Sequence, residues 1–418
     1  MNNLKEYRLS DLYDISSGIS STKQQAGHGA PFLSFKTVFN NVIVPDVLPD
    51  KMDTTKAEQN TFSIKKGDVF VTRTSETSDE LAMSCVALKD YPEATFSGFL
   101  KRLRPKEEGV VYDKYIAFYL RSSFFRQVII NNTIMTLRAS FNEDMFSFLK
   151  VYLPPYDEQV KVGDLLYSIE KGIQNNTKIC DSLQLQCQVL YDYWFIQFDF
   201  PDKFDKPYKS SGGEMIWNDE LKRHIPAGWK VGTLHDISKV IWGQCPEGKD
   251  ILDKSTSQKD VIDYCSGAGD MRNGFIVDCQ AKTYVDTSRR MAHKDAVLLS
   301  VAGSIGALCV TDHDISLGRA AVAFEADNSE HNMFIFNVLT MLSNQVQKLA
   351  TGSIQKVINN DHIDSMKFAY NEDVLNLYGN YTSLLYASLL NITEKNQRLV
   401  SLRNYILPIL MNGQISIS

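Results

Sequence analysis

Three short motifs have the residue types of catalytic or phosphate-binding sites, and each lacks a residue or a setting that the chemistry needs. Leu153-Pro-Pro-Tyr156 matches the (Asn/Asp)-Pro-Pro-(Tyr/Phe) pattern of amino-methyltransferases, but leucine cannot accept a hydrogen bond from a target amino group. Residues 243–250, GQCPEGKD, have aspartate where a phosphate-binding loop needs the serine or threonine that ligates magnesium. Pro201-Asp202 and Glu220-Leu-Lys222 have the residue order of a metal-dependent nuclease, but they lie in a segment that reads as a linker. With seven histidines at no metal-ligand spacing, the sequence predicts no catalytic site, metal site or cofactor in this chain.

A second group of residues has the chemistry of DNA contacts and follows the ends of predicted strands. Arginine and glutamine pair with guanine and adenine edges, while serine, threonine and backbone N–H groups hold phosphates. Each candidate alone is more often a solvated loop residue, but equivalent loops in the two halves carry different residues, which predicts two readers with different targets. The candidates are Arg73, Ser75, Thr77, Lys101, Arg102 and Arg138 in the first half, and Ser300, Ser304, Arg319, Ser353, Gln355 and Lys356 in the second.

The elements that must position these residues are predicted to form a mixed α/β unit in each half. A turn followed by a buried strand is expected at residues 64–73 and at its counterpart, residues 293–300, with further strands at 83–88 and 306–310. Amphipathic helices are expected at residues 112–130 and 333–349. Each unit is expected to close with a polar turn and a strand, at residues 136–152 and 352–368.

Each unit is followed by a long helix with an apolar seam. Pro154 and Pro155 favour a helix start, because a missing N–H costs nothing there. Apolar residues then recur at alternating steps of three and four, which is typical of a helix packed along another helix. From Asp157 to Trp194 this helix would be about 57 Å long, at about 1.5 Å per residue. The seam consists of Leu166, Ile169, Ile173, Asn176, Cys180, Leu183, Cys187, Leu190 and Trp194.

A similar pattern at residues 371–413 offers an intramolecular partner for this seam. Its apolar residues are Leu385, Ile392, Leu399, Leu402, Ile406 and Ile409. A shift of 219 positions places the triplet Leu165-Leu-Tyr167 on Leu384-Leu-Tyr386, and a shift of 222 places Asp14-Ile-Ser16 on Asp236-Ile-Ser238. Two unrelated long helices, each packed on its own domain, are the alternative.

The tandem duplication predicts the domain organisation. The boundaries are residues 1–152 for the first unit, 153–196 for a central helix, 197–228 for a linker, 229–369 for the second unit and 370–418 for a C-terminal helix. The 44% of hydrophobic and 22% of charged residues are ordinary for a globular protein. The net charge of −6 argues against a simple basic DNA-binding module. An odd set of seven cysteines without a CxxC pair, with no signal peptide or membrane span, predicts a cytoplasmic protein with reduced thiols.

Several of these segments together resemble the specificity subunit of type I restriction–modification enzymes. The family signatures LPPLxEQ and LFxxWF are similar to residues 153–159, LPPYDEQ, and 190–195, LYDYWF. IPxGW is similar to residues 225–229, IPAGW, and GSxQ to residues 352–355, GSIQ. The C-terminal LRxxLLPxLMSG is similar to residues 402–413. The second half departs from the pattern at residues 368–371, FAYN, where the LPP sequence is lost, and the first half has no clear GSxQ.

The resemblance implies an α+β fold: two tandem α/β target-recognition domains separated by two long antiparallel coiled-coil helices, duplicated about a pseudo-two-fold axis. Each domain would read one part of a bipartite target in double-stranded DNA. The helices would act as a spacer and dock two modification (methyltransferase) subunits, with or without restriction/translocase subunits. S-adenosylmethionine would belong to the modification subunit, and ATP and Mg to the restriction subunit. Apolar residues left over on the helix pair, including Tyr193, Phe195 and Tyr386, are the expected partner surface.

Two functions of other classes are alternatives, a stand-alone DNA methyltransferase and a coiled-coil scaffold that does not bind DNA. S-adenosylmethionine binding by the isolated chain would favour the first. The sequence leaves open which bases are recognised, the spacer length between half-sites, and which loop residues contact bases rather than phosphates.

Overall fold

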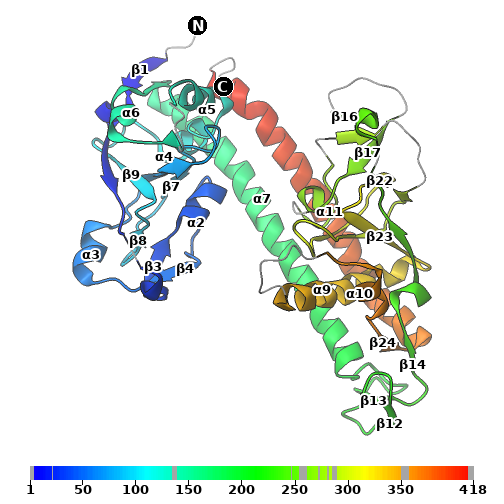
Figure 1. The fold of residues 1–418 in the computed structure, drawn as a ribbon. Coiled ribbons are helices and arrows are strands. Elements are labelled where there is room, and N and C mark those ends of the chain that lie inside the picture. The colour runs from blue at the N-terminus through cyan, green and yellow to red at the C-terminus, as the bar shows by residue number, and fades with distance from the viewer. Residues whose placement is uncertain are drawn as a thin grey trace. The chain divides into compact units, whose positions relative to one another are not determined.

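A computed structural model of the chain describes residues 4–20, 22–133, 139–245, 247–253, 261–271, 274–279, 282–284, 290–349 and 357–412. They form two compact units. Unit 1 consists of Met1–Ile173 with Leu399–Ser418, and unit 2 consists of Gln174–Arg398. Each unit therefore combines one of the predicted α/β regions with a part of both long helices (Figure 1).

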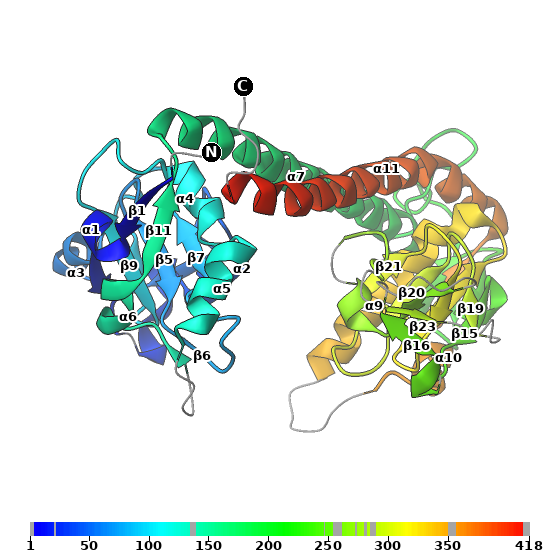
Figure 2. The ribbon, with the colours of Figure 1, turned by 90° about the horizontal axis from the view of Figure 1, so that it is seen from above.

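An antiparallel four-stranded sheet in the order β2-β9-β5-β7 forms the centre of unit 1. Its central strand β5 is buried throughout, as its run of apolar residues predicts. Helix α2 packs against β5 and β7, and α4 packs against β7 (Figure 2). The strands are β2 (Tyr13–Ser17), β9 (Leu100–Pro105), β5 (Val69–Thr72) and β7 (Ser84–Val86), and the two helices are α2 (Phe35–Asn40) and α4 (Asp113–Tyr119).

Shorter strands surround this sheet. Strand β1 pairs with β11, β6 pairs with β10, and β3 lies between β4 and β8. These elements and the remaining helices are β1 (Lys5–Arg8), α1 (Leu9–Leu12), η1 (Lys23–Gln25), β3 (Ala26–Leu33), β4 (Asp50–Met52), α3 (Lys56–Thr61), β6 (Thr74–Ser75), β8 (Thr95–Phe96), α5 (Ser123–Asn131), β10 (Ala139–Ser140), α6 (Glu143–Phe148) and β11 (Lys150–Leu153).

Unit 2 repeats the central sheet of unit 1. Its strands have the order β15-β23-β20-β21, and a second antiparallel pair, β14 with β24, corresponds to β1 with β11. The duplication predicted from the sequence is therefore present in the strand topology. The strands are β14 (Lys230–Gly232), β15 (Ser238–Trp242), β20 (Val297–Ser300), β21 (Leu308–Val310), β23 (Ala321–Ala326) and β24 (Phe368–Tyr370).

A five-stranded sheet in the order β16-β18-β17-β22-β19 distinguishes unit 2 from unit 1, where the corresponding small sheet has three strands. Helix α9 (Asn332–Leu349) agrees with the helix predicted at residues 333–349. The remaining elements of unit 2 are β12 (Met215–Asn218), β13 (Arg223–Pro226), η3 (Leu234–Asp236), η4 (Gly248–Asp250), β16 (Ile251–Asp253), β17 (Ile262–Cys265), α8 (Ala268–Met271), β18 (Lys282–Tyr284), β19 (Met291–Ala292), β22 (Ile315–Leu317), η5 (Ser329–His331), α9 (Asn332–Leu349) and α10 (Asn360–Asp364).

Two expectations about local structure were wrong. The single helix expected at residues 112–130 is two helices, α4 and α5, because the Ser122 hydroxyl accepts a hydrogen bond from Phe125 N and caps a new helix. The segment at 197–228, expected to be a linker crossing the surface, contains the hairpin β12–β13. Its Phe198, Phe200 and Ile225 are buried in the main core cluster of unit 2.

The first long helix is α7 (Tyr156–Tyr191), which continues into a π-helical turn, η2 (Asp192–Ile196). Every predicted seam residue is buried or half-buried, and Leu166, Cys187 and Trp194 are at most 3% exposed. Burial raises the pKa of the Cys187 thiol to about 11, so it stays protonated at neutral pH. The α7 seam therefore packs as the heptad pattern predicts.

The second long helix is α11 (Glu372–Met411). The LPP sequence that precedes the first long helix is missing here, and Asn371 caps the helix start instead. Its side-chain oxygen accepts hydrogen bonds from Asp373 N and Val374 N. Leu402, predicted to lie in the seam, is 46% exposed. The next seam residue after Leu399 lies four positions later and not three, so the half-buried Arg403 occupies the seam in place of Leu402.

Within each unit, the parts of α7 and α11 lie side by side and run antiparallel (Figures 1 and 2). In unit 1, Leu166 shares a core cluster with Leu410 and Met411. In unit 2, Cys187 shares one with Leu389, and the Tyr378 hydroxyl donates to the Cys187 carbonyl at 2.9 Å. The intramolecular pairing of the helices is thus confirmed in both units.

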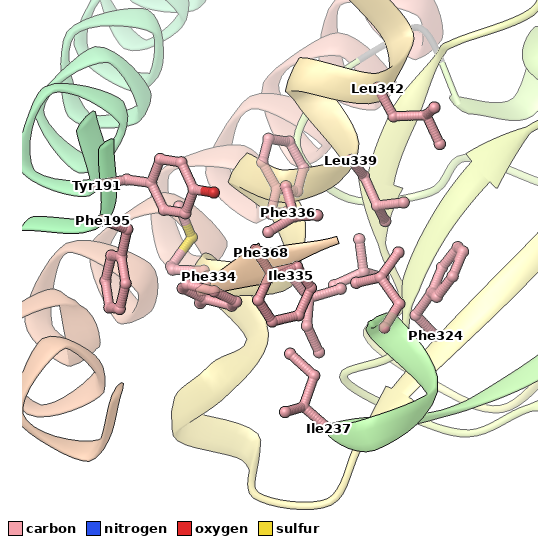
Figure 3. Packing of buried hydrophobic residues seen from close by; sticks show 14 of the residues in the cluster. Tyr191, Phe195, Ile237, Phe324, Phe334, Ile335, Phe336, Leu339, Leu342 and Phe368 are labelled. Atoms are coloured by element: carbon pink, nitrogen blue, oxygen red, sulfur yellow. The ribbon is translucent and has the colours of Figure 1, made fainter. Parts of the chain in front are cut away.

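The largest core cluster joins the helix ends of unit 2 to its α/β region (Figure 3). Phe334 on α9 packs edge-on against Phe195, with ring centroids 4.7 Å apart, and against Phe368 at 5.2 Å. Tyr191 stacks on Phe195 at 5.5 Å. Because aromatic side chains bury a large area each, this cluster ties the α/β region of unit 2 firmly to its helices.

Candidate nucleic-acid interface

A buried hydroxyl closes an equivalent loop in each unit. In unit 1, Thr72 is the last residue of strand β5. Its Oγ1 accepts a hydrogen bond from Met83 N at 2.9 Å, and its N–H donates to Met83 O at 3.0 Å. In unit 2, Ser300 is the last residue of strand β20. Its Oγ accepts a hydrogen bond from Ala307 N at 2.8 Å, and its N–H donates to Ala307 O at 2.9 Å. The loops closed in this way are residues 73–82 and the shorter residues 301–306.

The same backbone frame supports both loops. Arg73 N donates to Phe99 O and its carbonyl accepts from Phe141 N, with distances of 2.9 and 2.8 Å. At the equivalent place, Val301 N donates to Ala320 O and its carbonyl accepts from Ile358 N, both at 2.9 Å. The frame is therefore shared, whereas the side chains that it presents differ in charge and size.

Residues 96–99 of unit 1 form a turn, here called the tip, that is hydrogen-bonded to residues 18–19. Ile19 N donates to Phe96 O and Gly98 N donates to Ile19 O. A β-carbon on Gly18 would lie 2.3 Å from Ser97 O, so only glycine allows this approach. The tip therefore holds Phe99, which is 68% exposed, in a defined position.

Four of the predicted DNA-contact residues are exposed on or beside these loops. They are Arg73 and Thr77 in unit 1, and Ser304 and Arg319 in unit 2. Ser75 is half-buried, and its hydroxyl accepts from Thr77 N at 3.2 Å, which shapes the turn. These positions are compatible with contacts to a duplex.

Three other predicted residues have roles inside their units. The Lys101 ammonium donates to Ser17 Oγ at 2.9 Å, and Arg102 donates to Ser63 O at 2.7 Å, with both side chains buried in the central sheet. Burial lowers the pKa of Arg102, and the nearby Arg104 lowers it further. Ser300 is fully buried, and its hydroxyl closes the loop. Their geometry gives them no access to DNA in this conformation.

The remaining predicted contacts, Arg138, Ser353, Gln355 and Lys356, lie outside the described residues. Of the expected partner residues, Phe195 is 3% exposed and belongs to the core of unit 2. Tyr386 is half-buried and packs edge-on against Phe275, with ring centroids 5.8 Å apart. Only Tyr193, 36% exposed, presents its side chain as the sequence suggested.

A hollow lies beside the unit 1 loop, and the basic and small polar residues at strand ends do not reveal it. Its volume is about 560 Å³, and it is lined by Phe35, Phe39, Phe99 and by residues 74–76 and Glu80. A signal was present in the sequence, since Phe99 follows Ser97-Gly98 at a turn where a phenylalanine is hard to bury.

The motifs that resemble catalytic sites have structural roles where they are described. Leu153 is buried at the end of β11. Asp202 Oδ1 accepts from Phe204 N and Lys206 N within a turn, and Glu220 forms an ion pair with Lys367. Among the described residues, no three His, Cys, Asp or Glu side chains are grouped so as to hold a metal ion. None of the described helices has the length and hydropathy needed to span a membrane.

Comparisons with known proteins agree with this geometry. The family model of the type I restriction modification DNA specificity domain matches residues 1–185 and 226–370. The type I restriction enzyme MjaIX specificity subunit of Methanocaldococcus jannaschii is 21% identical, covering 98% of this chain and 93% of the relative. The HindI specificity subunit of Haemophilus influenzae is 20% identical, covering 99% of this chain and all of the relative, 100%.

A solved structure shares the fold. The crystal structure of the type I restriction–modification S subunit from M. genitalium matches with a TM-score of 0.57 and 14% identity, covering 98% of this chain and 96% of that chain. The family match supports neither a stand-alone methyltransferase nor a scaffold without DNA function. Because the two matched regions span most of its length, this chain belongs to the type I restriction–modification DNA specificity family and is the DNA-specificity subunit of such a system.

Proposed function

We propose that each unit reads one part of a bipartite target in double-stranded DNA, and that this chain leaves the chemistry to bound partners. The observation that carries the proposal is the shared loop frame, in which Arg73 and Phe99 occupy the places of Val301 and Ala320. Equal frames with different side chains are what two readers of different half-sites require. Arg73 and Thr77 in unit 1, and Ser304 and Arg319 in unit 2, are the proposed contacts among the exposed candidates.

The repeated Leu-Leu-Tyr triplet supports two equivalent docking sites for a modification subunit. Its middle leucine, Leu166 or Leu385, faces the helix seam in both repeats. Its tyrosine packs on the unit, with Tyr167 under the Lys114 ammonium and Tyr386 against Phe275. Its first leucine is left exposed on both helices.

That first leucine is Leu165, 41% exposed on α7, and Leu384, 78% exposed on α11. Further exposed apolar residues lie on or directly after the same helices. They are Leu185 and Val189 on α7, Tyr193 on η2, and Tyr381, Leu402 and Tyr405 on α11. Exposed apolar residues gathered on a helix favour contact with another protein. We therefore assign the docking of two modification subunits to these residues instead of Phe195 and Tyr386.

In this proposal the modification subunits bind S-adenosylmethionine and methylate adenine, and a restriction subunit, where one is present, uses ATP and Mg. Basic residues of the partners would neutralise part of the DNA phosphate charge, which reconciles DNA binding with a chain of net charge −6. We expect the assembled complex to act on DNA in the cytoplasm.

A domain graft tests the proposal. Residues 8–150 are replaced by the matching segment of a relative that has another target, and methylated adenines are mapped after co-expression with the modification subunit. One half-site should change and the other should stay the same. A change in both half-sites, or in neither, would refute the assignment of one unit to one half-site.

A further inference from the structure

The hollow of unit 1 combines an exposed aromatic side chain with carboxylates, which is an unusual surface for a protein that binds a polyanion. Phe99 is 68% exposed at its rim. Phe35 and Phe39 stack on each other inside it, with ring centroids 5.9 Å apart. Glu76 and Glu80 complete the lining from the closed loop, residues 73–82. Most large hydrophobic side chains of this sheet are buried, so Phe99 stands out against the rest of its strand end.

The backbone holds Phe99 in place although its ring faces solvent. Its carbonyl accepts from Arg73 N at 2.9 Å and its N–H donates to Ser97 Oγ at 3.2 Å. Gly98 N donates to Ile19 O at 2.8 Å, which anchors the turn to the neighbouring strand end. A turn whose backbone is fixed in this way loses little conformational freedom when it binds, which favours a recognition role.

The charges decide which part of DNA the hollow can meet. Carboxylates such as those of Glu76 and Glu80 repel phosphates, which are held instead by Arg, Lys, Ser, Thr and backbone N–H groups. At a base edge, however, a carboxylate accepts a hydrogen bond from the cytosine amino group, and a phenylalanine contacts the 5-methyl group of thymine. Both of these groups lie in the major groove.

We infer that the hollow at Phe99, Glu76 and Glu80 is the base-reading site of unit 1, with Phe99 on a thymine methyl group and a carboxylate on a cytosine amino group. This inference rests on the proposed function and adds the residues and the base chemistry. The exposed Arg73, whose backbone is tied to Phe99, holds the adjoining phosphate. In unit 2 the place of Phe99 is taken by Ala320, so this phenylalanine contact belongs to one half-site only.

The test compares wild-type and Phe99→Ala complexes, each assembled with the modification subunit, on synthetic duplexes. Methylation mapping first defines both half-sites, and the graft of residues 8–150 identifies the one that unit 1 reads. Each thymine of that half-site is then replaced in turn by deoxyuridine, which lacks only the methyl group. For the wild type, one replacement should weaken binding about fourfold, the effect expected from the loss of one buried methyl group.

The Phe99→Ala complex should bind the thymine duplex about as weakly as the wild type binds the deoxyuridine duplex, and should not distinguish the two. Glu80→Gln together with Glu76→Gln should relax the preference for one C·G pair in the same half-site. Phe204→Ala is the matched control, because Phe204 is 69% exposed in unit 2 and should affect neither base.

Three results would overturn the inference. One is a unit 1 half-site without a T·A pair, and another is equal sensitivity of wild type and Phe99→Ala to every deoxyuridine. The third is a uniform loss of binding to target and unrelated duplexes, which would give Phe99 a non-specific role. A wild-type complex without sequence preference in either half-site would instead refute the proposed function itself.

Discussion

The side-chain amide of Asn396 donates a hydrogen bond to the hydroxyl of Thr177 at 3.2 Å, and the two residues are one repeat length, 219 positions, apart. The duplication superposes these two residues, so the contact joins equivalent positions of the two long helices. Both residues lie in unit 2, so α7 and α11 pack in that unit with equivalent positions facing each other.

In unit 1, Arg403 and Glu170 form an ion pair at 2.7 Å in the seam, with side chains 23% and 12% exposed. We predict that Arg403→Ala lowers the free energy of unfolding by about 2 to 3 kcal/mol, because it leaves the Glu170 carboxylate without this partner in the seam. Chemical denaturation of the full chain measures the change. The double variant Glu170→Leu with Arg403→Leu should restore most of the stability.

Arg398→Ala is the control for this ion pair. Arg398 also lies on α11 and pairs with Glu394, but its side chain is 75% exposed. Exposed pairs of this kind contribute about 0.5 kcal/mol or less. An Arg403→Ala variant that loses no more stability than Arg398→Ala would contradict a structural role for the seam pair.

The loop-closing hydroxyls give a second prediction. Thr72→Val removes the acceptor for Met83 N and should cost about 1 kcal/mol locally, because this part-buried hydrogen bond is lost. Amide hydrogen exchange at Met83 should become faster, and recognition of the unit 1 half-site should relax. Ser300→Ala should do the same for Ala307 and the other half-site.

A hydroxyl outside these loops provides the comparison. The Thr61 hydroxyl donates to Ala57 O on the exposed helix α3. Thr61→Val should leave both half-sites unchanged. If Thr72→Val and Ser300→Ala each altered both half-sites, the two loops would not be independent readers.

The exposed leucines of the repeated triplet give a third prediction. Leu165→Asp and Leu384→Asp should each remove one modification subunit from the complex, since a buried unpaired carboxylate destabilises an apolar interface. Native mass spectrometry of the co-expressed complex counts the bound subunits. The double variant should bind none.

Val47→Asp is a suitable control, because Val47 is 82% exposed in unit 1 and lies on neither long helix. It should leave the subunit count at that of the wild type. Full assembly of the Leu165→Asp, Leu384→Asp double variant would place the docking surface elsewhere on the chain.

Some predictions about the site depended on the surroundings of a residue and could not be made from its type. Lys101 and Arg102 have the right chemistry for DNA, but both side chains are buried. Lys101 donates to Ser17 Oγ, and Arg102 donates to Ser63 O and lies over the Phe96 ring. Phe195 belongs to an aromatic motif that reads as a surface, yet Phe334 on α9 packs over it at 4.7 Å. In both cases segments distant in sequence bury the side chain.

One helix boundary was readable but overlooked. Ser122 is a favourable N-cap residue, and it divides the segment predicted as one helix into α4 and α5. A periodic pattern alone does not reveal such a break, because both helices keep an apolar face toward the same core. By contrast, the seam of α7 was read correctly at every position, since a long repeat averages over local exceptions.

The sequence by itself determined the tandem repeat, the two long helices and their pairing, because periodicity and repetition are properties of residue order. It also supplied the ordered motifs that resemble the specificity family. Only the tertiary structure decided that Phe99 faces solvent while Lys101 and Ser300 do not. Exposure depends on what packs against a side chain, and those neighbours come from strands and loops far away along the chain.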